Sequence, residues 1–113
     1  MKSIVYAVLD RWPERAVWLF DGCGREEDAF HVAVYTRLAQ EHPSFRFVCA
    51  LSDASSVPGD WCGDVGDVHQ SVATRLEGGV RRQAFVCGPE AMIAATSEVL
   101  KRKGVTNIHV DAF

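Results

Sequence analysis

The residues with the clearest chemical potential are Cys87, Gly88 and Pro89, which follow the apolar run AFV and precede a helical pattern. In a parallel sheet, ligands bind where strands end and helices begin, because the first N–H groups of each helix point outward there. Gly88 would let a ligand approach the backbone closely, and Cys87 would offer a polarizable thiol. From the residues alone, a buried cysteine that ends a strand is favoured about two to one over a binding cysteine.

Two further strand ends carry polar residues. Ser52 and Asp53 follow an apolar run, and such a pair can hold a ribose diol, while the carboxylate would repel a 2′-phosphate. Without other context, ordinary turn chemistry is the favoured interpretation of this pair. Asp21 and Gly22 begin the segment DGCG, a flexible loop that would make room for a flat ring. Trp61, in the long loop after Ser52, would cover a ligand or plug the loop onto the core, and we favour the plug.

Metal and disulfide chemistry are not predicted. The four cysteines are too widely spaced for CxxC motifs, and no two histidines stand at ligand spacing. A chain this rich in apolar residues does not need disulfides, so a disulfide has roughly one chance in ten. The histidines, which are interpreted as surface or satisfied core residues, are His31, His42, His69 and His109.

The elements that must position these residues alternate between helical and strand patterns. Helices are predicted over 3–12, over 26–43, from Asp67 to Gly78, and from Pro89 to Gly104. Apolar runs predict strands over 16–20, 45–51, 84–87 and 108–110. This alternation predicts an α/β fold: a doubly wound parallel sheet of about four strands with helices on both faces.

Helical spacing also predicts which side chains face the core. Ser3 is the expected N-cap of the first helix and Pro13 its stop. The residues expected to face inward are Ile4, Val5, Val8, Leu9 and Trp12 in the first helix, Ala29, Val32, Ala33 and Leu38 in the second, Val68, Val72, Ala73 and Leu76 in the third, and Met92, Ala95, Val99 and Leu100 in the last.

Length and composition exclude several classes of protein. At 113 residues the chain fits one domain, 1–113, and its 48% hydrophobic and 24% charged residues fit a globular fold. Twelve Lys and Arg against fifteen Asp and Glu give a net charge of −3, so nucleic acid is not the expected partner. No apolar run reaches the ~20 residues of a membrane span, and the N-terminus lacks a signal-peptide pattern, so we expect a cytoplasmic protein with no membrane partner.

Four segments carry a resemblance to a known family: EHPSFRFVCALS, WCGDVGDVHQSVA, AFVCGPEAMI and NIHVDAF. In this order they resemble the nicotinamide-binding domain of the ferredoxin-NADP reductase superfamily. The most similar branch is that of the bacterial flavin-dependent reductases that pass electrons to oxygenases, with the CDP-6-deoxy-glucoseen reductase-like proteins. The resemblance implies a Rossmann-like fold and an oxidoreductase that moves electrons from NADH through FAD to an iron–sulfur centre or an oxygenase component.

The resemblance also implies roles for individual residues. Cys87 would lie by the reactive carbon of the nicotinamide ring, and Phe113 would approach the flavin, so these two are the catalytic positions. The cofactor-binding positions are Asp21, Gly22, Ser52, Asp53, Cys87, Gly88, Pro89 and Met92. Ser52 and Asp53 would meet the adenosine ribose, where relatives that prefer the phosphorylated cofactor often carry basic residues. Gly24 stands where many relatives have Arg, and although Arg25 follows it, the balance favours NAD(H). The protein would align the two cofactors, and the cofactors would supply the reactivity.

The sequence departs from the family pattern at its start. Family members begin the domain with a strand and a Gly-rich turn, GGTG, and MKSIV resembles the segment directly after that turn. The chain is therefore expected to be truncated at its N-terminus, without the FAD-binding domain and without the central strand of the order 3-2-1-4-5. That loss would leave a gap of about 10 Å, which the sheet must close, fill with another chain or leave poorly packed. Such a domain is expected to be inactive in hydride transfer when alone.

Two alternatives stay open. A non-catalytic α/β module would use exposed sheet edges for self-association, as in a homodimer, or for docking to a partner. A small cysteine-dependent enzyme would use Cys87 as its nucleophile, although the sequence orders no base beside it.

Overall fold

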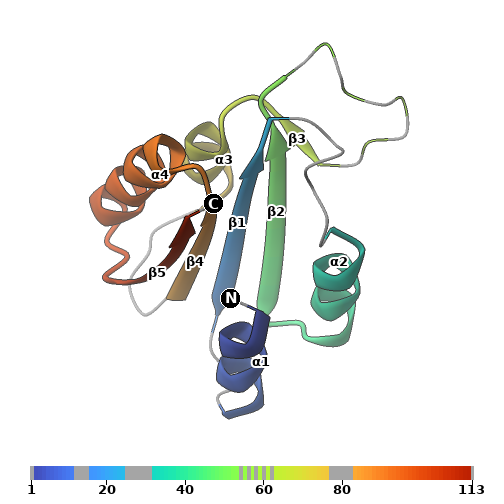
Figure 1. Ribbon diagram of the computed structural model, residues 1–113. Helices are drawn as coiled ribbons and strands as arrows, with labels where there is room; N and C mark the ends of the chain where they lie inside the picture. Colours follow the sequence, from blue (N-terminus) through green and yellow to red (C-terminus); the bar gives the residue numbers. More distant parts are fainter. Residues whose placement is uncertain are drawn as a thin grey trace.

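The computed structural model describes residues 2–11, 16–24, 32–53, 63–76 and 83–112, together with residues 55, 57, 59 and 61. Four helices and five strands lie within these residues (Figure 1). In chain order they are α1 (Lys2–Arg11), β1 (Val17–Cys23), α2 (Val32–Glu41), β2 (Phe45–Leu51), β3 (Asp64–Val65), α3 (Val68–Arg75), β4 (Gln83–Gly88), α4 (Glu90–Arg102) and β5 (Asn107–Ala112). Each predicted helix and strand has a counterpart, and β3 is additional.

The strands form one parallel sheet, as predicted. Its order is β3-β2-β1-β4-β5. β1 pairs with β2 from Val17↔Phe45 onward and with β4 from Val17↔Gln83 onward. The sheet has five strands instead of about four because β3 pairs two residues with Ala50 and Leu51 at the end of β2. A strand of two residues is too short to show periodicity, so the sequence pattern did not predict it.

The centre of the sheet is closed. β1 is hydrogen-bonded to neighbours on both sides, so the gap expected from a missing central strand is not present in the described residues. Of the three expected outcomes, closure of the sheet is the one observed. The carboxyl ends of β1, β2 and β4 therefore lie side by side, and Asp21 is in register with Cys49 on one side and Cys87 on the other.

Helices cover both faces of the sheet, which confirms the doubly wound architecture (Figure 1). α3 and α4 pack on one face, against side chains that include Phe20 and Val86. α1 and α2 pack on the other face, against side chains that include Leu19 and Phe85. Successive residues of a strand point to opposite faces, so each polar residue at a strand end belongs to one helix pair or the other.

The inward faces of α1 and α2 are predicted in part. In α1, Val5, Val8 and Leu9 are buried as predicted. Ser3 lies inside the helix, which begins at Lys2, so its prediction as the N-cap is wrong. Within α2, Leu38 is buried as predicted, but Val32 is half-buried and Ala33 is exposed. The inward position is taken by Tyr35, whose larger ring packs 5.3 Å from the ring of Phe47. Trp12, Pro13 and Ala29 lie outside the described residues.

The faces of α3 and α4 differ from prediction in a similar way. Asp67 caps α3 as predicted, and Val68, Val72 and Leu76 are buried. Ala73 is exposed, and Ser71 is buried in its place. Gly78 lies outside the described residues.

In α4, the predicted Val99 and Leu100 are buried, whereas Met92 and Ala95 are half-buried. The buried stripe begins at Ile93, because the Met92 side chain lies over glycines at the strand ends instead of entering the core.

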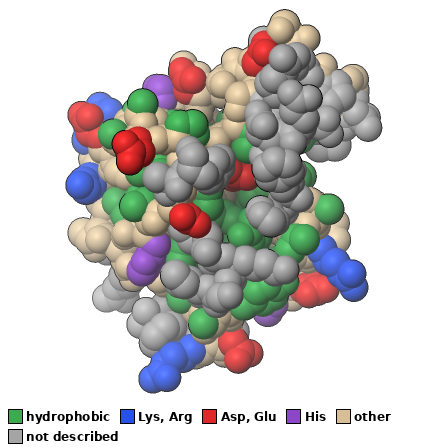
Figure 2. Space-filling model, in the orientation of Figure 1, with side chains coloured by type: hydrophobic (Ala, Val, Ile, Leu, Met, Phe, Trp, Pro, Cys, Tyr) green, Lys and Arg blue, Asp and Glu red, His purple; other side chains and the backbone are tan. Residues whose placement is uncertain are grey.

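Charged side chains of both signs are distributed over the surface. Figure 2 shows acidic and basic groups interspersed on the face it presents, in keeping with a net charge of −3. The described part of this face therefore carries no field of a single sign. None of the helices in the described part of the chain combines the length and apolar character that crossing a bilayer requires.

Candidate functional site

A cavity of about 160 Å³ lies at the carboxyl edge of the sheet, between the ends of β1 and β2 and the first residues of α3 and α4. Its walls are Gly22, Cys23, Gly24, Ala50, Ser52, Gly66, Asp67, Val68, Pro89 and Met92. Four of the residues predicted to bind a cofactor line it: Gly22, Ser52, Pro89 and Met92. The structure thus brings together residues that are up to 70 positions apart in the sequence, from Gly22 to Met92.

Two glycines make room for the Met92 side chain beside the cavity. A Cβ on Gly22 would lie 2.7 Å from Met92 Cε, and a Cβ on Gly88 would lie 1.9 Å from the same atom. Gly88 also has φ +151°, a conformation that side chains rarely adopt. The Met92 sulfur accepts a hydrogen bond of 3.3 Å from Thr96 Oγ1, which orients the thioether. Both glycines are therefore needed to seat this flexible apolar side chain.

The helix starts beside the cavity are held by local hydrogen bonds. Gly66, at φ +118°, donates its N–H to the Leu51 carbonyl over 2.8 Å, which fastens the turn before α3 to the end of β2. Gln70 Oε1 accepts a 3.3 Å bond from the Asp67 N–H and completes a capping box at the start of α3. Pro89 is the N-cap of α4. The N-termini of two helices thus lie at one edge of the sheet, where the helix dipoles favour negative charge.

The predicted ribose-binding pair is built into the same edge. The N–H groups of Ser52 and Asp53 donate to the carbonyls of Cys23 and Gly24 over 2.9 and 2.8 Å. Asp53 Oδ1 accepts bonds from the N–H and the hydroxyl of Ser55, at 3.1 and 2.6 Å. The turn chemistry favoured from the residues alone is therefore present. Ser52 lies in the cavity wall and Asp53 just beyond it.

Cys87 lies at the predicted strand end, but its side chain belongs to the opposite face of the sheet. It packs with residues of α1 and α2, including Val5 and Leu38, and is 8% exposed. Burial, followed by the negative charges of Asp21 and Asp111, raises the pKa of the Cys87 thiol to about 12. The thiol is therefore protonated at neutral pH, which argues against the cysteine-dependent enzyme. Phe113 lies outside the described residues.

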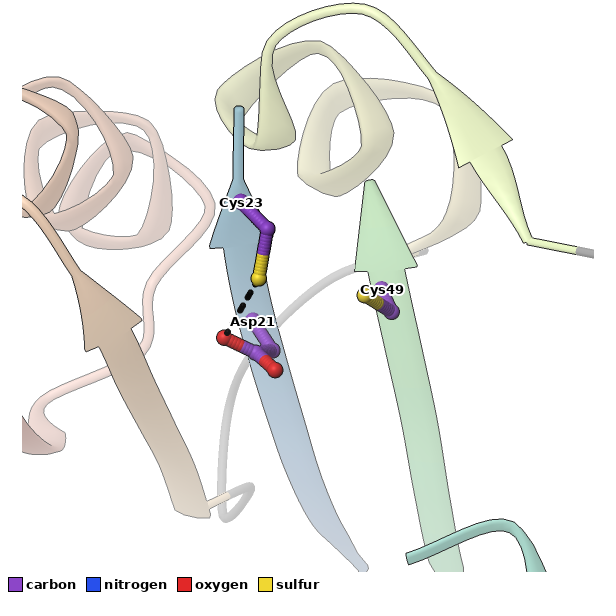
Figure 3. Close-up of side chains that lie close together, drawn as sticks. All are labelled: Asp21, Cys23 and Cys49. Carbon is purple, nitrogen blue, oxygen red and sulfur yellow. Dashed lines mark hydrogen bonds between the residues drawn. The ribbon is translucent and has the colours of Figure 1, made fainter. Parts of the chain in front are cut away.

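A cluster that the sequence analysis missed lies on the face of the sheet that also carries Cys87. Asp21, Cys23 and Cys49 are all buried, and their ligand atoms lie within 4.8 Å of one another (Figure 3). A hydrogen bond with Cys23, followed by burial and then the charge of Asp21, raises the pKa of Cys49 well above its ordinary value. The only signal in the sequence is an acid and a cysteine two positions apart in a strand, and the third member depends on the register with β2.

Other candidates from the sequence have structural roles. Trp61 packs against Cys23, Cys49 and Leu51 and donates its Nε1–H to the Asp64 carbonyl over 3.1 Å, which confirms that it plugs the loop onto the core.

His109 is half-buried and held by neighbouring side chains, which agrees with the structural role predicted for it. Its ring stacks on Phe85 with centroids 4.7 Å apart, and its Nε2 lies 3.0 Å from Gln83 Nε2. His31 lies outside the described residues.

A larger groove of about 580 Å³ runs along the outer edge of β2, bordered by Trp18, Phe45, Arg46, Phe47 and Arg75 among others. It lies beside the first half of β2, away from the strand ends. Ligands of open parallel sheets bind at the carboxyl ends of strands, so position favours the smaller cavity as the functional site.

Comparisons with known proteins bear on this site. Residues 1–98 match the family model described as the oxidoreductase NAD-binding domain. The reductase component DmpP of phenol 2-monooxygenase from Pseudomonas sp. strain CF600 is 32% identical over 100 residues, which cover 88% of this chain and 28% of that protein. The reductase subunit of an aromatic O-demethylase from Amycolatopsis sp. is 30% identical over 113 residues, which cover 98% of this chain and 33% of that protein.

Among solved structures, the cytochrome P450 reductase GcoB of Amycolatopsis has a similar fold. It aligns with a TM-score of 0.75 and 30% identity over 97% of this chain and 32% of its own. The chain thus spans about a third or less of the length of each of these proteins.

Proposed function

The chain belongs to the family of oxidoreductase NAD-binding domains, and on this basis we propose that it is the nicotinamide-binding part of an NADH-dependent flavoprotein reductase. In this proposal residues 1–113 form one domain that binds NAD(H), and FAD is held by a separate FAD-binding domain. Electrons pass from NADH through FAD to an iron–sulfur centre or an oxygenase component. The family match favours this function over the self-assembly module considered from the sequence.

One observation carries the proposal: the cavity at the carboxyl ends of β1 and β2, whose walls include four of the predicted cofactor-binding residues. Its volume is about 160 Å³, whereas sites that enclose a whole ligand usually measure about 300–1,000 Å³. The cavity therefore suits one ring of a dinucleotide. We assign it to the nicotinamide, with the rest of the cofactor extending over the strand ends toward Ser52 and Asp53.

The proposed roles of the residues follow from their positions. Pro89 would form part of the wall against which the ring lies, and Gly88 makes room for Met92, whose thioether would adapt to the edge of the ring. Bound FAD would supply the hydride acceptor, while these residues orient the ring and exclude water. Cys87, whose side chain belongs to the opposite face of the sheet, would support this wall from behind. The approach of Phe113 to the flavin stays a prediction from the family resemblance. Asp21 and Gly22 form the corresponding end of β1.

Asp53 supplies the proposed preference for NADH. Two unit charges about 4 Å apart in water repel by about 1 kcal/mol, and a 2′-phosphate carries up to about two charges. NADPH is therefore expected to bind roughly tenfold more weakly than NADH at low salt, and less so as salt screens the pair.

Calorimetric titration of the chain with NADH and with NADPH tests the proposal. The matched variants are Asp53→Asn and Glu98→Gln, because both remove one carboxylate, and Glu98 is exposed on α4, about 12 Å along the helix from its start. NADH should bind more tightly than NADPH, and only Asp53→Asn should narrow the difference. Equal binding of the two by the native chain would remove the role of Asp53. Binding of neither would contradict the proposed function.

The partners and location are part of the same proposal. The named partners are an FAD-binding domain and an iron–sulfur or oxygenase component, as the reductases similar to this chain suggest. A homodimer and a cytoplasmic location, both expected from the sequence, are kept as proposals. Sedimentation of the chain over a range of concentrations tests the homodimer, and a mass that stays monomeric throughout would contradict it.

A further inference from the structure

Asp21, Cys23 and Cys49 place three metal-binding atoms at one point of the sheet. Asp21 and Cys23 are two residues apart in β1, so both side chains emerge on the same face. Cys49 is the register partner of Asp21 on β2 and points to the same face. Figure 3 shows the three side chains converging, with the Cys23 thiol donating to Asp21 Oδ1 over 3.7 Å.

This cluster is separated from the proposed nicotinamide cavity by the sheet. The cavity opens on the side of α3 and α4, where Gly22 and Ala50 point. Cys23 and Cys49 instead pack in an apolar group with Leu51, against Phe47, Val32 and Trp61. The exposed fractions are 7% for Asp21, 5% for Cys23 and 4% for Cys49, so the three donors are enclosed. Cys23 is the one member of the cluster that also borders the cavity.

The spacing of the three donors fits a common ion. A tetrahedral Zn²⁺, at the bond lengths found in proteins, holds two sulfurs about 3.8 Å apart and a sulfur and an oxygen about 3.6 Å apart. The Cys23 sulfur already lies 3.7 Å from the Asp21 oxygen, and all three atoms lie within 4.8 Å of one another. Side-chain adjustments below about 1 Å would therefore complete the geometry.

A disulfide fits this position less well. Cys23 is in register with Leu51, two residues beyond Cys49 on the neighbouring strand. Strand spacing and rise then place the two Cα atoms about 8 Å apart, beyond the limit of about 7 Å for bridging without backbone movement. The geometry suits two sulfurs bound to one ion better than two sulfurs bound to each other.

We propose that Asp21, Cys23 and Cys49 bind one thiophilic divalent cation, with Zn²⁺ as the first candidate. Thiolate ligands select such metals over Mg²⁺ and Ca²⁺. Binding replaces the two S–H protons, which pass to the solvent, with two metal–sulfur bonds, and the carboxylate supplies the third bond. The fourth position of a tetrahedral ion falls to water or another small donor. Asp21 and Cys49 do not line the nicotinamide cavity, and the proposed metal site does not depend on the proposed function.

Cobalt titration tests the proposal, because Co²⁺ bound to thiolates absorbs through sulfur-to-metal charge transfer. The chain is first reduced, its free thiols are counted, and Zn²⁺ is used to displace the Co²⁺. We expect one Co²⁺ per chain with two-thiolate absorption, displaced by one equivalent of Zn²⁺. Cys23→Ser, Cys49→Ser and Asp21→Asn should each weaken binding at least about tenfold. Cys87→Ser is the comparison variant, since Cys87 is also buried beside Asp21 but lies on β4. Its loss of affinity should be clearly smaller than that of Cys23→Ser or Cys49→Ser, because no sulfur–metal bond is removed.

X-ray absorption at the zinc edge of the native chain keeps the test independent of whether each variant folds. The proposal predicts two sulfur and two oxygen or nitrogen neighbours around the ion. A shell without sulfur, native affinity in Cys49→Ser, or equal losses in Cys87→Ser and Cys49→Ser would each overturn the assignment. The proposal would also be overturned if a Cys23–Cys49 disulfide forms in the metal-free chain and persists when reductant and Zn²⁺ are added together.

Discussion

The contact between Gly22 and Met92 gives a quantitative test of how the cavity wall is built. In Gly22→Ala, the new methyl group would lie 2.7 Å from Met92 Cε and 3.1 Å from Met92 Cγ and Sδ. These atoms belong to the far end of a flexible side chain, so we expect a cost of about 1–2 kcal/mol in the free energy of unfolding, the lower part of the range for overpacking. Met92→Ala should cost about 1–2 kcal/mol, roughly half the usual loss for a buried methionine, because Met92 is half-buried.

The double variant separates this contact from unrelated effects. With Met92 truncated, the Gly22→Ala methyl group has space, so it should cost less than about 0.5 kcal/mol, and the coupling between the two positions should reach about 1 kcal/mol. Gly88→Ala is the contrast: its Cβ would also lie 3.0 Å from the Gly22 carbonyl oxygen, at φ +151°. Backbone strain of this kind costs about 1–3 kcal/mol whatever stands at position 92.

Urea unfolding of the single and double variants, followed by circular dichroism, measures these free energies. Strictly additive losses for Gly22→Ala and Met92→Ala, within about 0.3–0.5 kcal/mol, would refute the contact. Complete rescue of Gly88→Ala by Met92→Ala would refute the argument from backbone strain.

Three further predictions concern single residues. Arg75 donates its Nε–H to Asp64 over 2.8 Å and thereby lowers the pKa of that carboxyl. The stabilisation from this ion pair is present above the ordinary pKa of about 4 and is lost as pH falls through the lowered value. Because Arg75 is half-exposed, Arg75→Gln should lower the free energy of unfolding by about 0.5 kcal/mol at pH 7 and leave it unchanged in strong acid. Urea unfolding at several pH values measures this difference. The pKa of the Cys87 thiol is raised to about 12, so at pH 8 it should react with iodoacetamide at least about tenfold more slowly in the folded chain than in the urea-unfolded chain. Mass spectrometry of the peptide that contains Cys87 measures both rates, and equal rates would contradict its burial. Gly104 has φ +92° just after α4, so Gly104→Ala should lower the free energy of unfolding by about 1 kcal/mol. An unchanged midpoint of urea unfolding would contradict the assigned helix end.

Much of the fold was predictable because short-range chemistry determines it. The strand predicted over 45–51 and the observed β2 (Phe45–Leu51) begin and end at the same residues. A short, mostly apolar run between a turn and a polar pair is typical of a strand buried in a parallel sheet. Asp67 was predictable as a cap because its side chain and that of Gln70 satisfy the first N–H groups of α3 locally. The order of elements then led to the parallel sheet.

The features that the sequence did not predict depend on long-range packing. β3 is a strand because its two residues pair with Ala50 and Leu51 at the end of β2. Ala33 was expected inside α2, but the face of the helix is set by the ring of Tyr35 against the aromatic side chains of β2.

The candidate site shows the same division. Gly22 and Ser52 were predicted because each lies at the carboxyl end of a predicted strand, whereas the roles of Pro89 and Met92 came from the family resemblance. The cluster of Asp21 with two cysteines required the register between β1 and β2, which local patterns do not contain. The side of the sheet to which Cys87 points likewise became clear only with the register of β4.

The central claim, that the cavity at the carboxyl edge receives the nicotinamide of NADH, is tested most directly by titrating isotope-labelled chain with NADH and following the backbone amide resonances. We predict saturable shifts centred on the cavity, at Gly22, Gly24, Ser52, Gly66 and Met92. Shifts confined to Phe45, Arg46 and Phe47 in the groove beside β2, or no shifts at saturating NADH, would contradict it.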